Sequence, residues 1–150
     1  MRWTPKEIDA FNQAKEYIDT IMIPLIPVSI DQDMKQSASI HNFINILTMS
    51  VEQQFRGRIL LMPQLSYLSS SPVEDKLGLV RSWKQEASGF KHVLFITSDI
   101  EWKRHEGVLG GSLLWIPSMP LEHLADDQAR TLVNDQVRQL SDVFSKMWSK

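Results

Sequence analysis

Short runs of continuous apolar residues alternate with longer segments whose apolar residues recur every three or four positions. The short runs are typical of strands buried on both faces, and the longer segments are typical of amphipathic helices. Strands that alternate with helices favour a parallel sheet between two helical layers. We therefore predict an α/β fold, a three-layer helix/sheet/helix sandwich with a small, mostly parallel four-stranded sheet. Its strands are expected at residues 21–23, 59–62, 93–96 and 113–116.

Two helix starts carry a capping motif. Thr4, Pro5 and Glu7 combine a capping hydroxyl, a proline at the first helical position and an acidic residue three positions after the cap. The segment Ser71-Pro72-Val73-Glu74 repeats the same device. These motifs predict one helix over about 4–19 and another from about Ser71 to Gly89. Two further helices are predicted, one from Ser37 or Ser39 to about 55 and one from about 121 almost to the C-terminus.

The sequence pattern alone does not define three parts of the predicted sheet. Pro24 cannot donate a ladder hydrogen bond, so the first strand is expected to end near Ile23 or to continue as an edge or an extended loop. Residues 64–71 are rich in hydroxyls and are predicted to form an exposed connection. The connection before residues 113–116 is about as short as a parallel crossover allows, so this strand is either parallel or antiparallel, and we favour parallel.

Composition limits the class of protein. A chain of 150 residues matches one domain, which we expect to span 1–150. The lack of cysteine excludes disulfides, thiolate zinc sites and cysteine nucleophiles. A net charge of −2 argues against binding to nucleic acid or to anionic membranes. No apolar leader or membrane-spanning stretch is apparent, which predicts no membrane insertion and a cytoplasmic protein.

Polar side chains are expected at one edge of the sheet. In open parallel sheets, ligands bind beyond the carboxyl ends of the strands. Asp99 follows a predicted central strand directly, where such proteins often hold a metal or a phosphoacceptor carboxylate, but it equally suits the N-cap of a short helix at 100–104. The candidate ligand-binding residues are Asp31, Gln64, Tyr67, Ser98 and Asp99, which are also the residue types that loops and caps require.

Tryptophans and the last helix raise the question of an interface. Trp102 and Trp148 lie beside charged residues and are candidates for exposed anchors. The last helix is long enough to overhang a small sheet, so its distal turn either packs in the core or contacts a second subunit or another partner. The candidate interface residues are Trp102, Phe144, Met147 and Trp148.

Sequence motifs for known chemistry are lacking. The four histidines form no paired motif on a helix, there is no Gly-x-Ser-x-Gly elbow, and the glycines at 107–111 precede a strand without the Lys-Ser/Thr of a phosphate loop. We therefore predict no catalytic residue, metal or cofactor. The favoured hypothesis is a non-enzymatic interaction or regulatory domain. The alternative is a binder of a nucleotide, phosphate or cation, or a weakly marked hydrolase or transferase, centred on Asp99.

The N-terminal part of the chain resembles a known family. Residues 1–8, 13–20 and 23–28 are similar to the YpiF-like family of uncharacterised proteins from spore-forming Gram-positive bacteria. The family has no established activity, so the resemblance supplies no catalytic residues. Its members tend to be encoded beside genes for the menaquinol to cytochrome c reductase, which implies a cytosolic accessory role near respiration.

Overall fold

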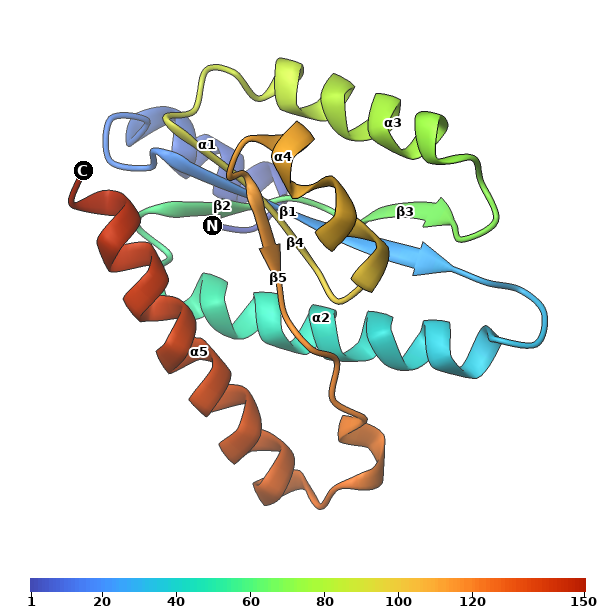
Figure 1. The fold of residues 1–150 in the computed structure, drawn as a ribbon. Helices are drawn as coiled ribbons and strands as arrows, with labels where there is room; N and C mark the ends of the chain where they lie inside the picture. Colours follow the sequence, from blue (N-terminus) through green and yellow to red (C-terminus); the bar gives the residue numbers. More distant parts are fainter.

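The structure is a computed structural model that describes residues 1–150. Five strands form one sheet, and helices cover both of its faces (Figure 1), as the predicted sandwich requires. None of the helices combines the length and the apolar character that crossing a membrane demands. The elements are α1 (Pro5–Gln13), β1 (Thr20–Val28), α2 (Met34–Gln54), β2 (Ile59–Leu61), β3 (Leu65–Leu68), α3 (Val73–Glu86), β4 (His92–Thr97), the 3-10 helix η1 (Ile100–His105), α4 (Glu106–Leu109), β5 (Leu113–Trp115), the 3-10 helix η2 (Leu121–His123) and α5 (Asp126–Trp148).

All strand pairs are parallel. The order is β2-β1-β4-β5, and β3 also pairs with β1. Register aligns Ile23 with Phe95 between β1 and β4, and Phe95 in turn with Leu113 of β5. The prediction of a parallel last strand is thus confirmed, while β3 is a fifth strand where we expected an exposed connection.

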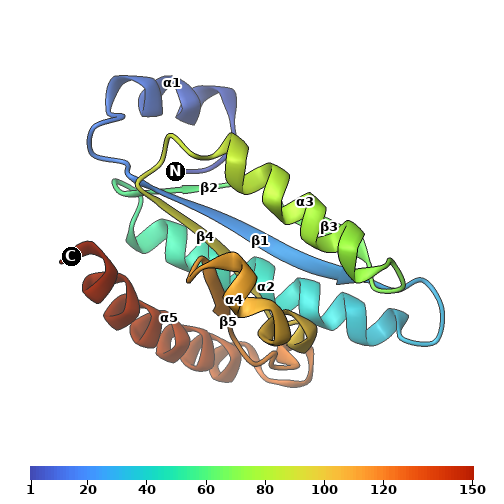
Figure 2. The ribbon, with the colours of Figure 1, turned by 45° about the horizontal axis from the view of Figure 1, so that its top comes forward.

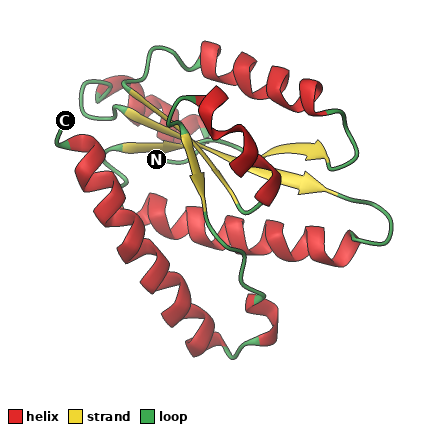
Figure 3. Ribbon diagram, in the orientation of Figure 1, coloured by secondary structure: helices red, strands yellow, loops and turns green.

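The sheet separates two hydrophobic cores. Helices α2 and α5 cover one face, and α1, α3 and α4 cover the other (Figures 2 and 3). Side chains alternate across β1, so that Met22 joins the core under α2 and α5 while Ile23 joins the core under α3. Almost every residue of β1 is buried. The continuous apolar sequence of β1 is therefore explained by helices on both faces.

Of the alternatives considered for Pro24, an end of the first strand near Ile23 is wrong, because β1 runs on to Val28 and pairs with β3 beyond Pro24. Backbone carbonyls of Met22 and Val28 face the side of β2 and β3, because they accept from Met62 and Ser69. Since alternate residues of a strand face the same neighbour, Pro24 faces that side as well. It lies opposite the break between Leu61 and β3, where the neighbouring strand is interrupted. No ladder donor is missing there, and the strand continues.

The helix boundaries differ from those predicted. Thr4 caps α1 as expected, accepting from the Glu7 backbone N–H at 3.2 Å, but α1 ends at Gln13 because the chain must turn to enter β1. Helix α2 begins at Met34, and Ser37 instead donates to the Pro27 carbonyl at 2.8 Å. Helix α3 begins where predicted, but without a side-chain capping hydrogen bond from Ser71.

The end of α5 is attached to the start of the sheet. The Trp148 indole N–H donates to the Thr20 hydroxyl at 2.9 Å, and the Arg58 guanidinium lies 4.3 Å from the centre of the Trp148 ring. Arg58 also forms an ion pair with Asp19 at 3.2 Å. The distal turn of α5 therefore packs on its own domain.

Candidate functional site

Three of the predicted residues meet at the carboxyl ends of β3 and β4. The Tyr67 hydroxyl donates to Asp99 Oδ2 at 2.6 Å and accepts from the Trp102 indole N–H at 2.6 Å. The two aromatic rings contact each other edge to face, with centroids 5.7 Å apart. Ser98 lies between the end of β4 and Asp99. The structure thus brings Tyr67, Ser98 and Asp99 together, and adds Trp102, which we had assigned to an interface.

Asp99 is fully engaged within the protein. Its Oδ1 accepts from the Glu101 backbone N–H at 3.1 Å, which makes Asp99 the N-cap of η1, one of the two roles considered for it. Its own backbone N–H donates to the Thr97 hydroxyl, which donates to the Leu25 carbonyl. Both carboxylate oxygens therefore already accept one hydrogen bond each, which accounts for Asp99 as a structural residue without any ligand.

The Tyr67 phenol is held in its neutral form. Burial and the adjacent Asp99 carboxylate raise the pKa of Tyr67 well above its ordinary value. A phenol that keeps its proton can donate to Asp99 but cannot act as a base near neutral pH. These contacts suit a structural connection between β3 and η1 better than proton transfer.

A buried lysine extends this connection. Lys76 of α3 is only 5% exposed, and its ammonium donates to the Ser69 carbonyl at 2.8 Å and to Glu101 Oε2 at 3.1 Å. Sequence reasoning missed Lys76, because nothing in a helical charge pattern signals a partner 25 residues away. In contrast, the hydroxyl of Ser98 is buried without a hydrogen-bond partner.

The other two predicted residues lie apart. Gln64 occupies the break between β2 and β3, and its amide donates to the Asn45 side chain on α2 at 3.2 Å. Asp31 follows β1 and accepts from the Ser29 hydroxyl at 3.0 Å. Thus Asp31 is at the strand-end edge, as expected, whereas Gln64 is not part of the same group.

An open hollow of about 530 Å³ lies between the ends of β1 and β3, and we call it the strand-end hollow. Two large apolar side chains at this hollow are exposed to solvent, Ile30 by 71% and Leu68 by 50%. Val28, two carboxylates and three serine hydroxyls supply the remaining lining, without a basic residue. The lining residues are Val28, Ser29, Ile30, Asp31, Asp33, Leu68, Ser69 and Ser70.

The strand-end hollow offers little for catalysis. No histidine or lysine lines it, so its serines have no adjacent base. Across the whole chain, no three histidine, cysteine or acidic side chains lie close enough to hold a metal ion. The hollow instead combines exposed apolar side chains with negative charge, which are features of a surface that binds another molecule.

The predicted interface residues are largely buried. The expectation that Trp102 is an exposed anchor is wrong, because it is 2% exposed and its indole N–H is bonded to Tyr67. Phe144 is completely buried in the core, in edge-to-face contact with Phe55. Met147 and Trp148 are partly buried against the same core. A role for the distal turn of α5 in self-association stays a prediction.

Comparisons with known proteins place the chain among uncharacterised relatives. A family model described as "Protein of unknown function (DUF2487)" matches residues 9–148. The chain is 31% identical over 149 residues to the "Uncharacterized protein YpiF" of Bacillus subtilis (strain 168), covering 99% of each chain. No solved structure matches.

Proposed function

The chain belongs to the DUF2487 family of proteins of unknown function, and we propose that it is a non-enzymatic interaction domain that binds a protein partner through the strand-end hollow. The single observation that carries this proposal is the exposure of Ile30 and Leu68 on either side of the hollow. Large apolar side chains grouped at a concave surface are typical of interaction sites. The sheet edge is also where ligands of parallel α/β proteins bind.

The lining of the hollow suggests the chemistry of the partner. Asp31 and Asp33 are exposed and form no ion pair within the protein. A complementary segment would insert an apolar side chain between Ile30 and Leu68 and place lysine or arginine beside the two carboxylates. Nucleic acid and anionic membranes do not fit this surface, since both would be repelled by it.

The alternative, binding or chemistry centred on Asp99, has less support. Both of its carboxylate oxygens are occupied by Tyr67 and by the N-terminus of η1. A ligand at Asp99 would have to share these two oxygens with hydrogen bonds that the protein already makes. A cytoplasmic location and an accessory role near respiratory complexes, which the family resemblance implies, stay predictions.

Site-specific photo-cross-linking tests the proposal. A photoreactive amino acid replaces Leu68 at the hollow or, as the control, Val143 on α5, whose side chain is also exposed, by 45%. Both variants are irradiated in the cells that make the protein. We expect a discrete adduct from position 68 that is absent from position 143, with the cross-linked segment containing apolar residues flanked by lysine or arginine.

Three results would contradict the proposal. These are no adduct at position 68, equal adducts at both positions, or a cross-linked segment that is acidic. An adduct only at position 143 would move the interaction to α5. Because both substitutions are at exposed positions, both variants should fold, and circular dichroism verifies that they do.

A further inference from the structure

A second hollow lies near the other end of the sheet, beneath α1. Its volume is about 280 Å³, and it is enclosed by α1, by α3 with the loop that follows it, and by β1 and β2. We call it the α1 cleft. Nine of its eleven lining residues are hydrophobic, and four of these are aromatic. The lining residues are Trp3, Ile8, Phe11, Asn12, Ile21, Leu60, Met62, Trp83, Glu86, Ala87 and Phe90.

The helix above the cleft is incompletely packed. No residue of α1 is fully buried, although Ile8 and Phe11 face the core on this side of the sheet. Phe11 stacks on Phe90 with centroids 5.8 Å apart, and both rings line the cleft. Trp3 stays 54% exposed. An occupant of the cleft would cover apolar surface that the protein itself leaves in contact with water, which favours binding.

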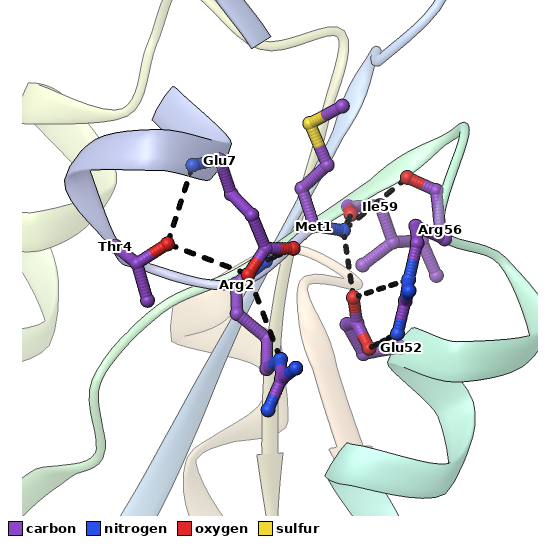
Figure 4. Close-up of polar contacts among 7 residues, drawn as sticks. All are labelled: Met1, Arg2, Thr4, Glu7, Glu52, Arg56 and Ile59. Atoms are coloured by element: carbon purple, nitrogen blue, oxygen red, sulfur yellow. Dashed lines mark hydrogen bonds and ion pairs between the residues drawn. The ribbon is translucent and has the colours of Figure 1, made fainter. Parts of the chain in front are cut away.

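The residues on either side of Trp3 in the chain are nevertheless held by polar contacts of Met1 and Thr4, which Figure 4 shows. Before it, the Met1 ammonium forms an ion pair with Glu52 at 3.3 Å and donates to the carbonyl of Ile59, and the Met1 carbonyl accepts from Leu61 of β2 at 2.7 Å. After it, Thr4 caps α1. This one wall of the cleft, which contains Trp3, is therefore held in place without a ligand, which reduces the entropic cost of binding.

The lining of the α1 cleft carries a negative charge and no positive one. Glu86 is its only ionisable lining residue, and its carboxylate forms no hydrogen bond or ion pair within the protein. No lysine, arginine or histidine lines the cleft. Aromatic faces attract cations, and a carboxylate beside them adds to that attraction. Four aromatic rings with one unpaired carboxylate thus favour a cation over a neutral or anionic ligand.

We propose that the α1 cleft binds a small organic cation, an amine or quaternary ammonium with an apolar body. The volume sets the size, since a cavity of roughly 150 Å³ accommodates benzene and this cleft is about twice as large. An apolar body of about ten carbon atoms therefore fits. An α-helix of a partner protein does not, because its diameter with side chains is about 10 Å or more.

Three probes with the same apolar body test the charge preference. They are 4-phenylbutylamine, 4-phenylbutan-1-ol and 4-phenylbutyrate, titrated into the full chain while the indole N–H resonances of Trp3 and Trp83 are followed by NMR. We expect the amine to shift both resonances and to bind roughly three- to tenfold more tightly than the alcohol. The butyrate should bind most weakly. Equal binding of all three, tightest binding of the alcohol or butyrate, or no shift of either indole would overturn the proposal.

A pair of carboxylate variants locates the charge. Glu86→Gln should weaken binding of the amine while leaving the affinity for the alcohol unchanged, and any preference for the amine that persists measures the contribution of the aromatic rings. Glu74→Gln is the matched control, because it removes an exposed carboxylate from the same helix about 18 Å away along its axis. Equal losses in both variants, or none in Glu86→Gln, would contradict the assigned site. These outcomes are independent of the proposed function, since they concern a different surface.

Discussion

At the scale of single residues, the strand-end edge is maintained by polar groups that satisfy one another. The Tyr67 hydroxyl accepts a hydrogen bond from the Trp102 indole N–H and donates one to Asp99, and Asp99 caps the first turn of η1. Buried polar groups are costly when unpaired, so such a chain of hydrogen bonds is sensitive to the loss of any member. The network positions the loops around the strand-end hollow.

Removal of the Tyr67 hydroxyl should destabilise the protein. Tyr67→Phe leaves the Trp102 indole N–H and one Asp99 oxygen without partners, which we expect to reduce the free energy of unfolding by about 1–3 kcal/mol. Tyr17→Phe is the control, because Tyr17 is 68% exposed and should show almost no change. Urea denaturation of the two variants measures the difference. Similar values for both would show that the buried hydrogen bonds contribute little.

A pH prediction concerns Asp19. Burial of Asp19 opposes its charge, but hydrogen bonds from Arg58 and Thr20 outweigh it, so the pKa of Asp19 is lowered from 3.8. A carboxyl with a depressed folded-state pKa contributes stability that is present above its unfolded pKa and is lost as the pH falls through the folded one. The stability advantage of wild type over Asp19→Asn should therefore shrink as the pH falls below 3.8. Denaturation at several pH values checks this, with Asp142→Asn as the surface control; a constant difference would refute the assignment.

At the scale of elements, the sequence predicts the strands with long apolar runs and misses the one without. Apolar runs identify β1, β2, β4 and β5 because helices lie on both faces of the sheet, although β5 at its edge is only partly buried. Strand β3 alternates buried Leu65 and Tyr67 with exposed Ser66 and Leu68. Four residues are too few for that alternation to be distinguished from a polar loop, and only pairing with β1 defines the strand.

Part of the candidate site could be predicted, because apolar runs show where strands end. Tyr67 and Asp99 are expected at one edge because each follows a predicted parallel strand, and they do meet there, although Tyr67 lies within β3. The burial of Trp102 and the ion pair of Lys76 depend on how η1 and α3 pack over that edge. Such contacts between distant parts of the chain leave no local pattern in the sequence. Sequence analysis therefore predicts Trp102 at the surface and does not identify the contacts of Lys76.

The attachment of α1 depends on Glu52. This carboxylate is 1% exposed and contacts both the Met1 ammonium and Arg56. Glu52→Gln removes the charge that balances them, which should lower the free energy of unfolding by about 1–3 kcal/mol. Glu16→Gln, at an exposed position without an ion pair, is the control. Thermal denaturation measures the loss of stability. An equal change in both variants would argue against a role for Glu52 in attaching α1.

Helix α1 should also open more easily than the rest of the molecule. It has no fully buried residue, whereas α2 buries Phe43, Ile44 and Leu47 among others. Local opening is easier where few apolar contacts are lost. We therefore expect the backbone amides of α1 to exchange with deuterium faster than those of α2 and β1. Equal protection of α1 and α2 would mean that the α1 cleft is filled or closed in solution.

At the scale of the whole molecule, one parallel sheet separates two surfaces with different chemistry. The strand-end hollow lies beyond the carboxyl ends of β1 and β3, and its exposed apolar and acidic side chains suit a basic protein segment. The α1 cleft lies toward the amino ends of β1 and β2, where Ile21 and Leu60 form its floor, and its aromatic lining suits a small cation. Both proposals therefore treat the molecule as a scaffold for binding, in which the buried polar groups serve stability.

The most direct test of this account is the affinity of the partner segment identified by cross-linking, measured by calorimetry with the wild-type chain and with Leu68→Ser. Val143→Ser is the control for the loss of an exposed apolar side chain. We predict that Leu68→Ser weakens binding by roughly tenfold or more, without loss of folding stability, and that Val143→Ser has no effect. Unchanged affinity in Leu68→Ser would contradict the claim that the strand-end hollow is the functional surface.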